Sequence, residues 1–337
     1  MQTVTLGAGS AGPLTVSALG FGGMALTSAY GGLSADEALA VLNAAVDDGI
    51  ILVDTANVYG DGTNEELVGR LLADRRDEVV VATKFGIVHG ADGTRHARGD
   101  AAYVRRCAEE SLRRLSADVI DLYYLHRRDL SVPLSETVGA MAALVDAGLV
   151  RHLALCEVTA AEIREAHAVH PITAVQSEWS VFSRDVEHAV VPACAQLGIG
   201  FVPFAPLGRG FLAGAVRSVA DLGPDDARHD FPRFDADNLG ANLELLAEIE
   251  ASAHETGITL AEMALAWLYA KGEDAGLTVV PIPGSRHPER NRQNAAAVDI
   301  SLSAEQVAEL DSAAARVAGA RSRDRSWVSE GRERSAD

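Results

Sequence analysis

Cysteine is scarce in this chain of 337 residues, and its three copies, Cys107, Cys156 and Cys194, lack the spacing of metal ligands. Because three thiols cannot all pair within one chain, we expect a reducing compartment, the cytoplasm. Long apolar runs are absent too, since no charge-free apolar stretch reaches the ~18 residues of a membrane span. The N-terminus also lacks the basic region and apolar core of a signal peptide.

Positive charge is in deficit, with 29 Lys and Arg against 48 Asp and Glu and a formal net charge of −19. Such an acidic surface argues against nucleic acid and anionic membranes, so neither is an expected partner. No pattern in the chain specifies an oligomeric state. Apolar residues are plentiful at 48%, which suffices for a large core.

A unit of buried strand and amphipathic helix repeats along the chain. Residues 3–16 alternate apolar and polar around glycines, which predicts a leading β-hairpin. Strands are predicted at 18–22, 50–54, 78–84, 119–125, 150–156, 173–177, 199–204 and 278–282. Helices are predicted at 35–49, 63–74, 100–115, 135–147, 159–169, 185–197, 239–257, 287–297 and 303–318. Capping boxes are predicted at Ser34…Glu37, Thr63…Glu66, Thr159…Glu162, Thr259…Glu262 and Ser303…Gln306.

Eight strands alternating with helices predict an α/β fold, a (β/α)8 TIM barrel. An open doubly wound sheet is the competitor, but it usually carries a G-x-G-x-x-G turn when it binds a dinucleotide, and residues 20–23 lack that spacing. Residues 85–99 and 205–238 are long loops expected to shape a site at the carboxyl face. We assign 1–318 to one barrel domain and 319–337 to an extended tail, flexible or a lid, with Trp327 as the candidate lid residue.

Polar residues end three adjacent predicted strands. Asp54 closes the second, Lys84 the third and His126 the fourth, while Tyr59 follows Asp54 in the next loop. Each alone has an ordinary explanation, such as a salt bridge or a solvated lysine. Because the carboxyl ends of neighbouring barrel strands meet at one face, the four together predict a chemical site.

The chemistry that these four residues suggest is proton transfer from Tyr59. A free tyrosine titrates near pH 10, and we expect the Lys84 ammonium, oriented by Asp54, to lower that pKa. His126 can donate a hydrogen bond to a substrate carbonyl and polarise it. None of these side chains is a reductant, so a bound hydride donor is implied.

On these residues the chain resembles the aldo-keto reductase family over nearly its whole length. The matching segments are Asp54 with Tyr59-Gly60-x-Gly62, Glu65 to Gly69, Thr83-Lys84 and Leu125-His126. The resemblance implies a barrel with a leading hairpin, and a catalytic tetrad of Asp54, Tyr59, Lys84 and His126. It also implies NADP(H) as cofactor and a small carbonyl compound as substrate.

The resemblance also assigns cofactor contacts along the second half of the chain. Gln176 would hold the nicotinamide carboxamide, and Phe204 would stack on the ring where a tyrosine is usual. The segment from Pro281 to Asn294 would clamp the 2′-phosphate and adenine, and its arginines and helix N-terminus suit an anion. The expected cofactor residues are Gly23, Met24, Asp54, Cys156, Gln176, Phe204, Pro206, Leu207, Gly208, Gly210, Ser285, Arg286, Arg290, Gln293 and Asn294.

The chain departs from the family pattern at two positions. Cys156-Glu157 stands where Ser-Asn or Ser-Glu is common, and a thiol is the weaker hydrogen-bonding group. A reactive-cysteine role for Cys156 is the less favoured alternative. Trp179 replaces a usual tyrosine and is either a pocket wall or core. The expected substrate-binding residues are Met24, Tyr59, Phe85, His126 and Trp179.

The leading hypothesis is an NADPH-dependent reductase of aldehydes or ketones in which Tyr59 protonates the carbonyl oxygen. The alternative is a non-catalytic NADP-binding subunit on the same fold that senses redox state for a partner. A third hypothesis is a Schiff-base lyase with Lys84 as nucleophile, in which the 285–294 segment would have no purpose.

Overall fold

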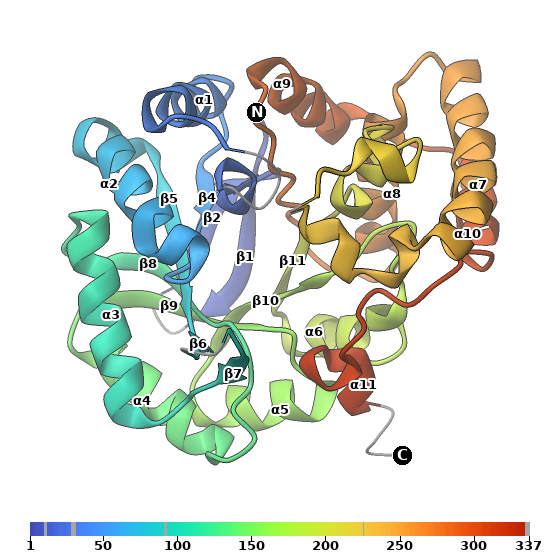
Figure 1. Cartoon of the computed structure of the whole chain (residues 1–337). Coiled ribbons are helices and arrows are strands. Elements are labelled where there is room, and N and C mark those ends of the chain that lie inside the picture. The colour runs from blue at the N-terminus through green and yellow to red at the C-terminus, as the bar shows by residue number, and fades with distance from the viewer. Residues whose placement is uncertain (10–11, 28–31, 91–92, 225, 334–337) are drawn as a thin grey trace.

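The computed structural model describes residues 1–9, 12–27, 32–90, 93–224 and 226–333. Seven parallel strands curve into a nearly closed barrel with helices outside it, which confirms the predicted fold (Figure 1). The predicted hairpin is present as β1 (Thr3–Gly9) and β2 (Gly12–Ser17), although its residues 10–11 lie outside the described ones. In spatial order the barrel strands are β3 (Phe21–Gly22), β4 (Leu52–Asp54), β5 (Val80–Phe85), β8 (Ile120–Leu125), β9 (Val150–Cys156), β10 (Ile172–Glu178) and β11 (Gly200–Phe204).

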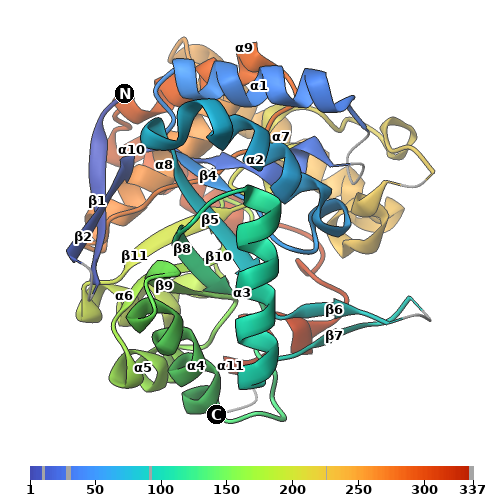
Figure 2. The same cartoon turned by 90° about the vertical axis from the view of Figure 1, so that its left-hand side faces the viewer.

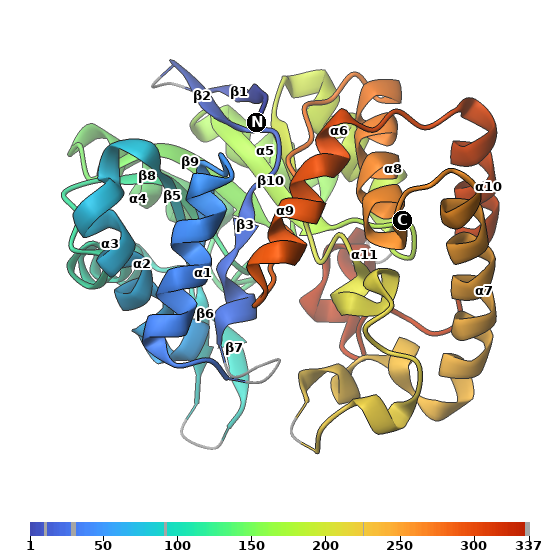
Figure 3. The same ribbon diagram turned by 90° about the horizontal axis from the view of Figure 1, so that it is seen from above.

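The predicted eighth strand, 278–282, is not a regular strand in the structure. It makes a single parallel bridge, between Val279 and Phe201, and Pro281 and Pro283 have no N–H to extend a ladder. The segment still closes the barrel, because Ile282 N donates to Pro203 O of β11 (3.0 Å) and Pro281 O accepts from Gly20 N (2.9 Å) beside β3. It leads into α9 (Pro288–Ala296), which packs beside α1 (Ala35–Asp47) (Figure 3).

Strand register decides which side chains enter the barrel. Alternate residues of each strand point to opposite faces. The interior is filled by an inner core, closed at the amino end by Leu6, Leu14 and Val16 of the hairpin, whereas the other strand faces pack under the helices. The inner core from the strands and the closing segment comprises Leu52, Ala82, Leu122, Tyr124, Ala154, Cys156, Ala174, Val202, Val280 and Ile282.

The outer helices mostly follow the predicted ranges. The predicted 185–197 helix is split into a 3-10 turn, Asp185–Glu187, and α6, and the chain also forms α8, for which the sequence analysis predicts only the capping box at its start. Besides α1 and α9, the helices are α2 (Thr63–Arg75), α3 (Ala101–Leu115), α4 (Leu134–Asp146), α5 (Ala160–Val169), α6 (Val190–Leu197), α7 (Ala236–Glu255), α8 (Leu260–Asp274), α10 (Ala304–Ala314) and α11 (Ser329–Glu333).

Four of the five predicted capping boxes are confirmed, at Ser34, Thr159, Thr259 and Ser303. The box predicted at Thr63 is wrong. There α2 begins after a glycine in the left-handed region, and the Thr63 hydroxyl donates to Gly60 O at 2.7 Å instead of capping a backbone N–H. The Thr63 side chain therefore stabilises the turn that carries Tyr59 and does not cap α2.

Both long loops carry structure of their own. The 85–99 loop contains an antiparallel hairpin, β6 (Ile87–His89) and β7 (Arg95–Ala97), which projects from the barrel (Figure 2). The 205–238 loop winds through 3-10 turns at Gly208–Ala213, Val219–Asp221, Ala227–Asp230 and Pro232–Phe234. Residues 91–92 and 225 lie outside the described part of the chain.

The tail is not extended where the structure describes it, so that expectation is corrected. Residues 325–327 form a 3-10 turn and Ser329–Glu333 form α11, which is bonded to the start of α5 through Glu333 and Ala160 N (Figure 1). Arg321 and Ser329 are buried, and both donate hydrogen bonds to the buried carboxylate of Glu157. Residues 334–337 lie outside the described residues. In the described chain, no helix has the length and apolarity needed to cross a bilayer.

Candidate active site at the carboxyl end of the barrel

Strand register carries three of the four predicted catalytic side chains toward the barrel axis. Asp54 lies two residues after Leu52, Lys84 two after Ala82 and His126 two after Tyr124, so each continues an inward-facing row at the carboxyl end. Tyr59 reaches the same end from the 3-10 turn Tyr59–Gly62. That turn holds Gly60 and Asp61 at positive φ, 58° and 52°.

The structure brings the four side chains into one cluster. The Lys84 ammonium forms a fully buried ion pair with Asp54 and also donates to Thr55 O at 2.8 Å. The Lys84 Nζ lies 5.1 Å from the centroid of the Tyr59 ring. The rings of Tyr59 and His126 meet edge to face, with centroids 5.9 Å apart and planes at 80°. The cluster thus joins a fixed cation, a phenol and an imidazole.

Charge states in the cluster follow from burial and from this ion pair. Burial opposes a charge on Lys84, but the adjacent Asp54 carboxylate outweighs it, so the pKa of Lys84 lies above its ordinary value. Burial raises the pKa of Tyr59 above its ordinary value, and Lys84 only partly offsets this. The expectation of a lowered Tyr59 pKa is therefore corrected for the protein alone, in which the phenol holds its proton firmly.

His126 is neutral and has a free ring nitrogen. Burial first, and then the charges of Arg127 and Lys84, hold the pKa of His126 well below its usual value. Its Nδ1 is buried and has no partner among the described residues. A buried polar atom without a partner is costly, and it suits an imidazole that meets a ligand.

Cys156 faces the inner core at the end of β9, beside the tetrad. Burial raises the pKa of its thiol to about 11, and Arg127 Nη1 donates to Sγ at 3.2 Å. A protonated thiol is a poor nucleophile, which disfavours the reactive-cysteine alternative. Gln176 also faces inward, and its Nε2 donates to Asp54 Oδ2 at 2.9 Å, so the amide supports the Asp54–Lys84 pair in the protein alone.

The segment after β11 turns sharply where cofactor contacts are expected. Phe204 is half-buried and continues the inward row after Val202. Gly208 and Gly210 have φ of +56° and +89°, and Arg209 between them has φ 59°, a backbone geometry that favours glycine. Pro206 is buried and Leu207 half-buried. Within this turn Gly208 N donates to Ala205 O at 2.9 Å and Gly210 N to Leu207 O at 3.1 Å.

The closing segment and β3 approach each other closely. A Cβ on Gly22 would lie 2.6 Å from Ile282 O, and one on Gly284 would lie 2.2 Å from Gly22 O, so this contact requires glycine. Gly23 packs in the same way against β4, where a Cβ would lie 2.7 Å from Asp54 O. Met24, Ser285, Arg286 and Gln293 are half-buried, Arg290 is exposed and Asn294 is buried. The Ser285 hydroxyl accepts from His287 N (3.1 Å) at the start of α9.

Two expected substrate-binding residues belong to the core instead. Phe85 is fully buried and stacks on Tyr123 with centroids 5.0 Å apart, because it follows inward-facing Lys84 by one residue and so points to the helices. Trp179 is fully buried between Phe201 and Trp267. Both assignments are corrected. Met24 and Tyr59 are half-buried and His126 is buried, and their contact with substrate stays a prediction.

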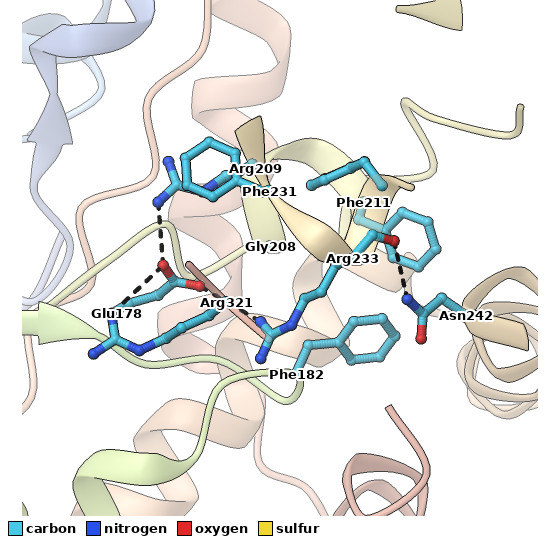
Figure 4. A pocket seen from close by; sticks show the side chains of 10 residues that line it. Glu178, Phe182, Gly208, Arg209, Phe211, Phe231, Arg233, Asn242 and Arg321 are labelled. Atoms are coloured by element: carbon cyan, nitrogen blue, oxygen red, sulfur yellow. Dashed lines mark hydrogen bonds and ion pairs between the residues drawn. The ribbon is translucent and has the colours of Figure 1, made fainter. Parts of the chain in front are cut away.

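An ionic cluster behind the Gly208 turn surrounds a small cavity (Figure 4). Glu178 accepts from Arg209 Nη2 at 3.1 Å and from the Ser183 hydroxyl at 2.7 Å, and it lies 3.6 Å from Arg233. Arg321 from the C-terminal segment joins it at 4.0 Å. These ion pairs connect the 205–238 loop and the C-terminal segment to Glu178 at the end of β10.

Sequence reasoning missed two residues here. Arg321 pairs with Glu157 across 164 positions, which no local pattern signals. Arg127 follows His126 directly, and only that adjacency could have drawn attention to it.

A parallel barrel with an ion-paired lysine, a tyrosine and a neutral histidine at its carboxyl mouth defines a barrel protein with an acid–base site. The sequence model of the Aldo/keto reductase family matches residues 18–315, and the chain belongs to this family of oxidoreductases. Members generally use a nicotinamide cofactor and act on carbonyl substrates.

Solved structures agree with this assignment. A glycerol dehydrogenase from Gluconobacter oxydans is 27% identical with a TM-score of 0.83, and the match covers 93% of this chain and 95% of that one. An aldo-keto reductase from Bacillus halodurans in its holo form is 28% identical with a TM-score of 0.75, covering 94% and 98%. A thermostable aldo-keto reductase bound to the inhibitor epalrestat is 28% identical with a TM-score of 0.73, covering 93% and 100%.

Proposed function

We propose that the protein reduces an aldehyde or ketone to an alcohol with NADPH as hydride donor and Tyr59 as general acid. The observation that carries the proposal is the contact of a protonated tyrosine with a neutral histidine, beside an ammonium that Asp54 holds in place. The phenol can give a proton, and Tyr59 is half-buried whereas Lys84 and the Cys156 thiol are fully buried.

The residues around the cluster suit a nicotinamide dinucleotide. Phe204 offers a flat, half-buried apolar face, and Gly23, Gly208, Gly210 and Gly284 carry no side chain of their own where the cofactor contacts are proposed. Arg286 and Arg290 at the start of α9 suit the 2′-phosphate that distinguishes NADPH from NADH. When bound, the cofactor supplies the hydride.

Each member of the cluster then has a distinct task. Neutral His126 donates a hydrogen bond to the substrate carbonyl oxygen and orients it. Tyr59 releases its proton to the same oxygen as charge develops there. Lys84 stabilises the phenolate that remains, since an ammonium 5.1 Å from the ring centroid favours the anion. Asp54 keeps Lys84 charged and fixed.

The two other hypotheses fare less well. A Schiff-base lyase needs a neutral lysine, whereas Lys84 is fully buried in an ion pair and its pKa is raised. A non-catalytic redox-sensing subunit does not require His126 to keep a buried ring nitrogen without a partner.

The test is a screen of NADPH consumption with small aldehydes, aromatic aldehydes, diketones and sugar-like ketones. We expect turnover of at least one class, with the alcohol as product. NADPH binding without turnover of any of these carbonyl compounds would instead support the redox-sensing alternative.

A further inference from the structure

Arg127 extends from the end of β8 over the rim of the tetrad. Its Nη1 donates to His126 O at 2.7 Å and to Cys156 Sγ at 3.2 Å. The Trp327 ring of the C-terminal segment covers the guanidinium, with Cζ 5.9 Å from the ring centroid. The guanidinium is therefore held on one edge by groups of the site and on one face by an aromatic ring.

The positive charge of Arg127 has no partner of opposite sign in the described part of the chain. Within the described residues no carboxylate lies within 4.0 Å of it, although the similarly half-buried Arg128, Arg209 and Arg233 all have one. The charge of Arg127 helps to lower the pKa of Glu157, but the Glu157 oxygens accept their hydrogen bonds from Arg321 and Ser329 instead. In a chain of net charge −19, an uncompensated guanidinium at this point is unusual.

The edge of the guanidinium formed by Nε and Nη2 lacks an acceptor among the described residues. Neither Nε nor Nη2 of Arg127 donates to any described residue, and Nε is buried. A buried donor without an acceptor is costly, and a carboxylate can accept from both nitrogens at once in a forked geometry. The same charge reaches the reacting groups, since it helps to keep His126 neutral.

We propose that Arg127, under the cover of Trp327, binds a carboxylate carried close to the substrate carbonyl, so that the substrates are 2-oxo acids and similar carboxylated aldehydes or ketones. This inference rests on the proposed function. Arg127 reaches back over the barrel mouth to Cys156 Sγ of the inner core at 3.2 Å, so a substrate carbonyl that accepts from His126 would set an adjacent carboxylate near its guanidinium.

The experiment compares phenylglyoxylate with its methyl ester, which has the same carbon skeleton without the charge. We expect the wild type to prefer the acid in kcat/KM. Arg127→Met should lower the acid-to-ester ratio by about 10- to 100-fold, since charge-assisted hydrogen bonds are lost. Arg127→Lys, which keeps the charge without the fork, should lie between, and added salt should reduce the wild-type ratio.

The matched control is Arg105→Met, which removes an exposed arginine from α3 and lowers net charge equally. Its ratio should equal that of the wild type. A wild-type ratio near one, or an unchanged ratio in both Arg127 variants, overturns the inference while leaving carbonyl reduction intact. A weaker NADPH dissociation constant with an unchanged ratio also overturns it, because Arg127 would then serve the cofactor. If no carbonyl compound is turned over, the proposed function fails together with the inference.

Discussion

Two buried ion pairs lie at the carboxyl end of the barrel, and they differ in how fully their surroundings are satisfied. Glu157, at the end of β9, accepts from both terminal nitrogens of Arg321, from the backbone and hydroxyl of Ser329, and from Glu178 N. Asp54, at the end of β4, accepts from Lys84 and Gln176, while beside it His126 Nδ1 and the Tyr59 hydroxyl bond to no described residue. The carboxylate of the first cluster is saturated, although Arg321 Nε has no partner among the described residues, and we call this cluster closed; the second, whose imidazole and phenol lack partners, we call open.

The difference separates a structural role from a chemical one. Buried charge alone does not identify a site, because both pairs are nearly inaccessible to solvent. A saturated pair holds chain segments together, here the barrel and the C-terminal segment. An open cluster leaves polar atoms that a bound ligand can satisfy. Substitutions in the closed cluster should therefore change the free energy of unfolding, whereas substitutions in the open cluster should change the rate of carbonyl reduction.

The largest effect is expected at Tyr59. Tyr59→Phe should lower kcat/KM for carbonyl reduction by about 10²–10⁴-fold, because it removes the group proposed to protonate the carbonyl oxygen. The dissociation constant of NADPH should stay nearly unchanged, as should the melting temperature, since the ring remains. Steady-state kinetics on the best substrate of the screen, with fluorescence quenching for cofactor binding, measure both. Near wild-type turnover would remove Tyr59 from the mechanism.

The closed cluster should respond in stability. Arg321→Met leaves Glu157 buried without its counter-ion, which should cost about 3–5 kcal/mol in the free energy of unfolding. The double variant Arg321→Met with Glu157→Gln removes both charges and should recover much of that loss. Urea unfolding of the three proteins at pH 7 measures the difference. If the single variant is as stable as the wild type, the C-terminal segment is not anchored by this pair.

The pH dependence of the same pair has a definite sign. Burial alone would raise the pKa of Glu157, but Arg321 outweighs it and holds it at about 2, below the unfolded value of about 4.3. Its contribution to stability should thus be fully present above pH 4.3 and fade as the pH falls toward 2. The difference in the free energy of unfolding between the wild type and the double variant should therefore become smaller as the pH falls from 4.3 to about 2.

A smaller effect is expected at the exposed end of the cofactor segment. Arg286→Ala with Arg290→Ala should weaken NADPH and leave NADH nearly untouched, because only NADPH carries the 2′-phosphate. A loss of about 10- to 100-fold is expected, shrinking as salt rises. Arg292→Ala, on the same helix but paired with Asp48, is the control. Equal wild-type affinity for both cofactors would show that this segment does not read the phosphate.

The open cluster could be predicted from the sequence because its parts are local to strand ends. Asp54, Lys84 and His126 each close a buried strand, and parallel strands in a barrel bring their ends together. Arg321 could not be predicted in the same way, since its partner is 164 positions away and it lies beyond the 18–315 match to the family. The prediction that Phe85 contacts substrate was wrong for a simpler reason. Phe85 lies one residue after inward-facing Lys84, and adjacent residues of a strand point to opposite faces.

The smallest predicted effect lies at Cys156, which stands in the open cluster next to the closed one. Its thiol is protonated and accepts a hydrogen bond from Arg127 Nη1 at 3.2 Å, and a serine hydroxyl in its place would be a stronger partner for Arg127 and for a nicotinamide amide. A neutral hydrogen bond contributes roughly 0.5–1.5 kcal/mol, so Cys156→Ser should leave kcat equal or several-fold higher.

Cys156→Ala, which removes the hydrogen bond altogether, should change kcat by a similar factor in the opposite direction. Single-turnover rates with saturating NADPH compare the three proteins without interference from product release. A nucleophilic cysteine would behave differently, because both substitutions would then abolish turnover. Complete loss in Cys156→Ser would therefore restore the covalent role, whereas a graded series of Ser, Cys and Ala would tie this residue to positioning in the open cluster.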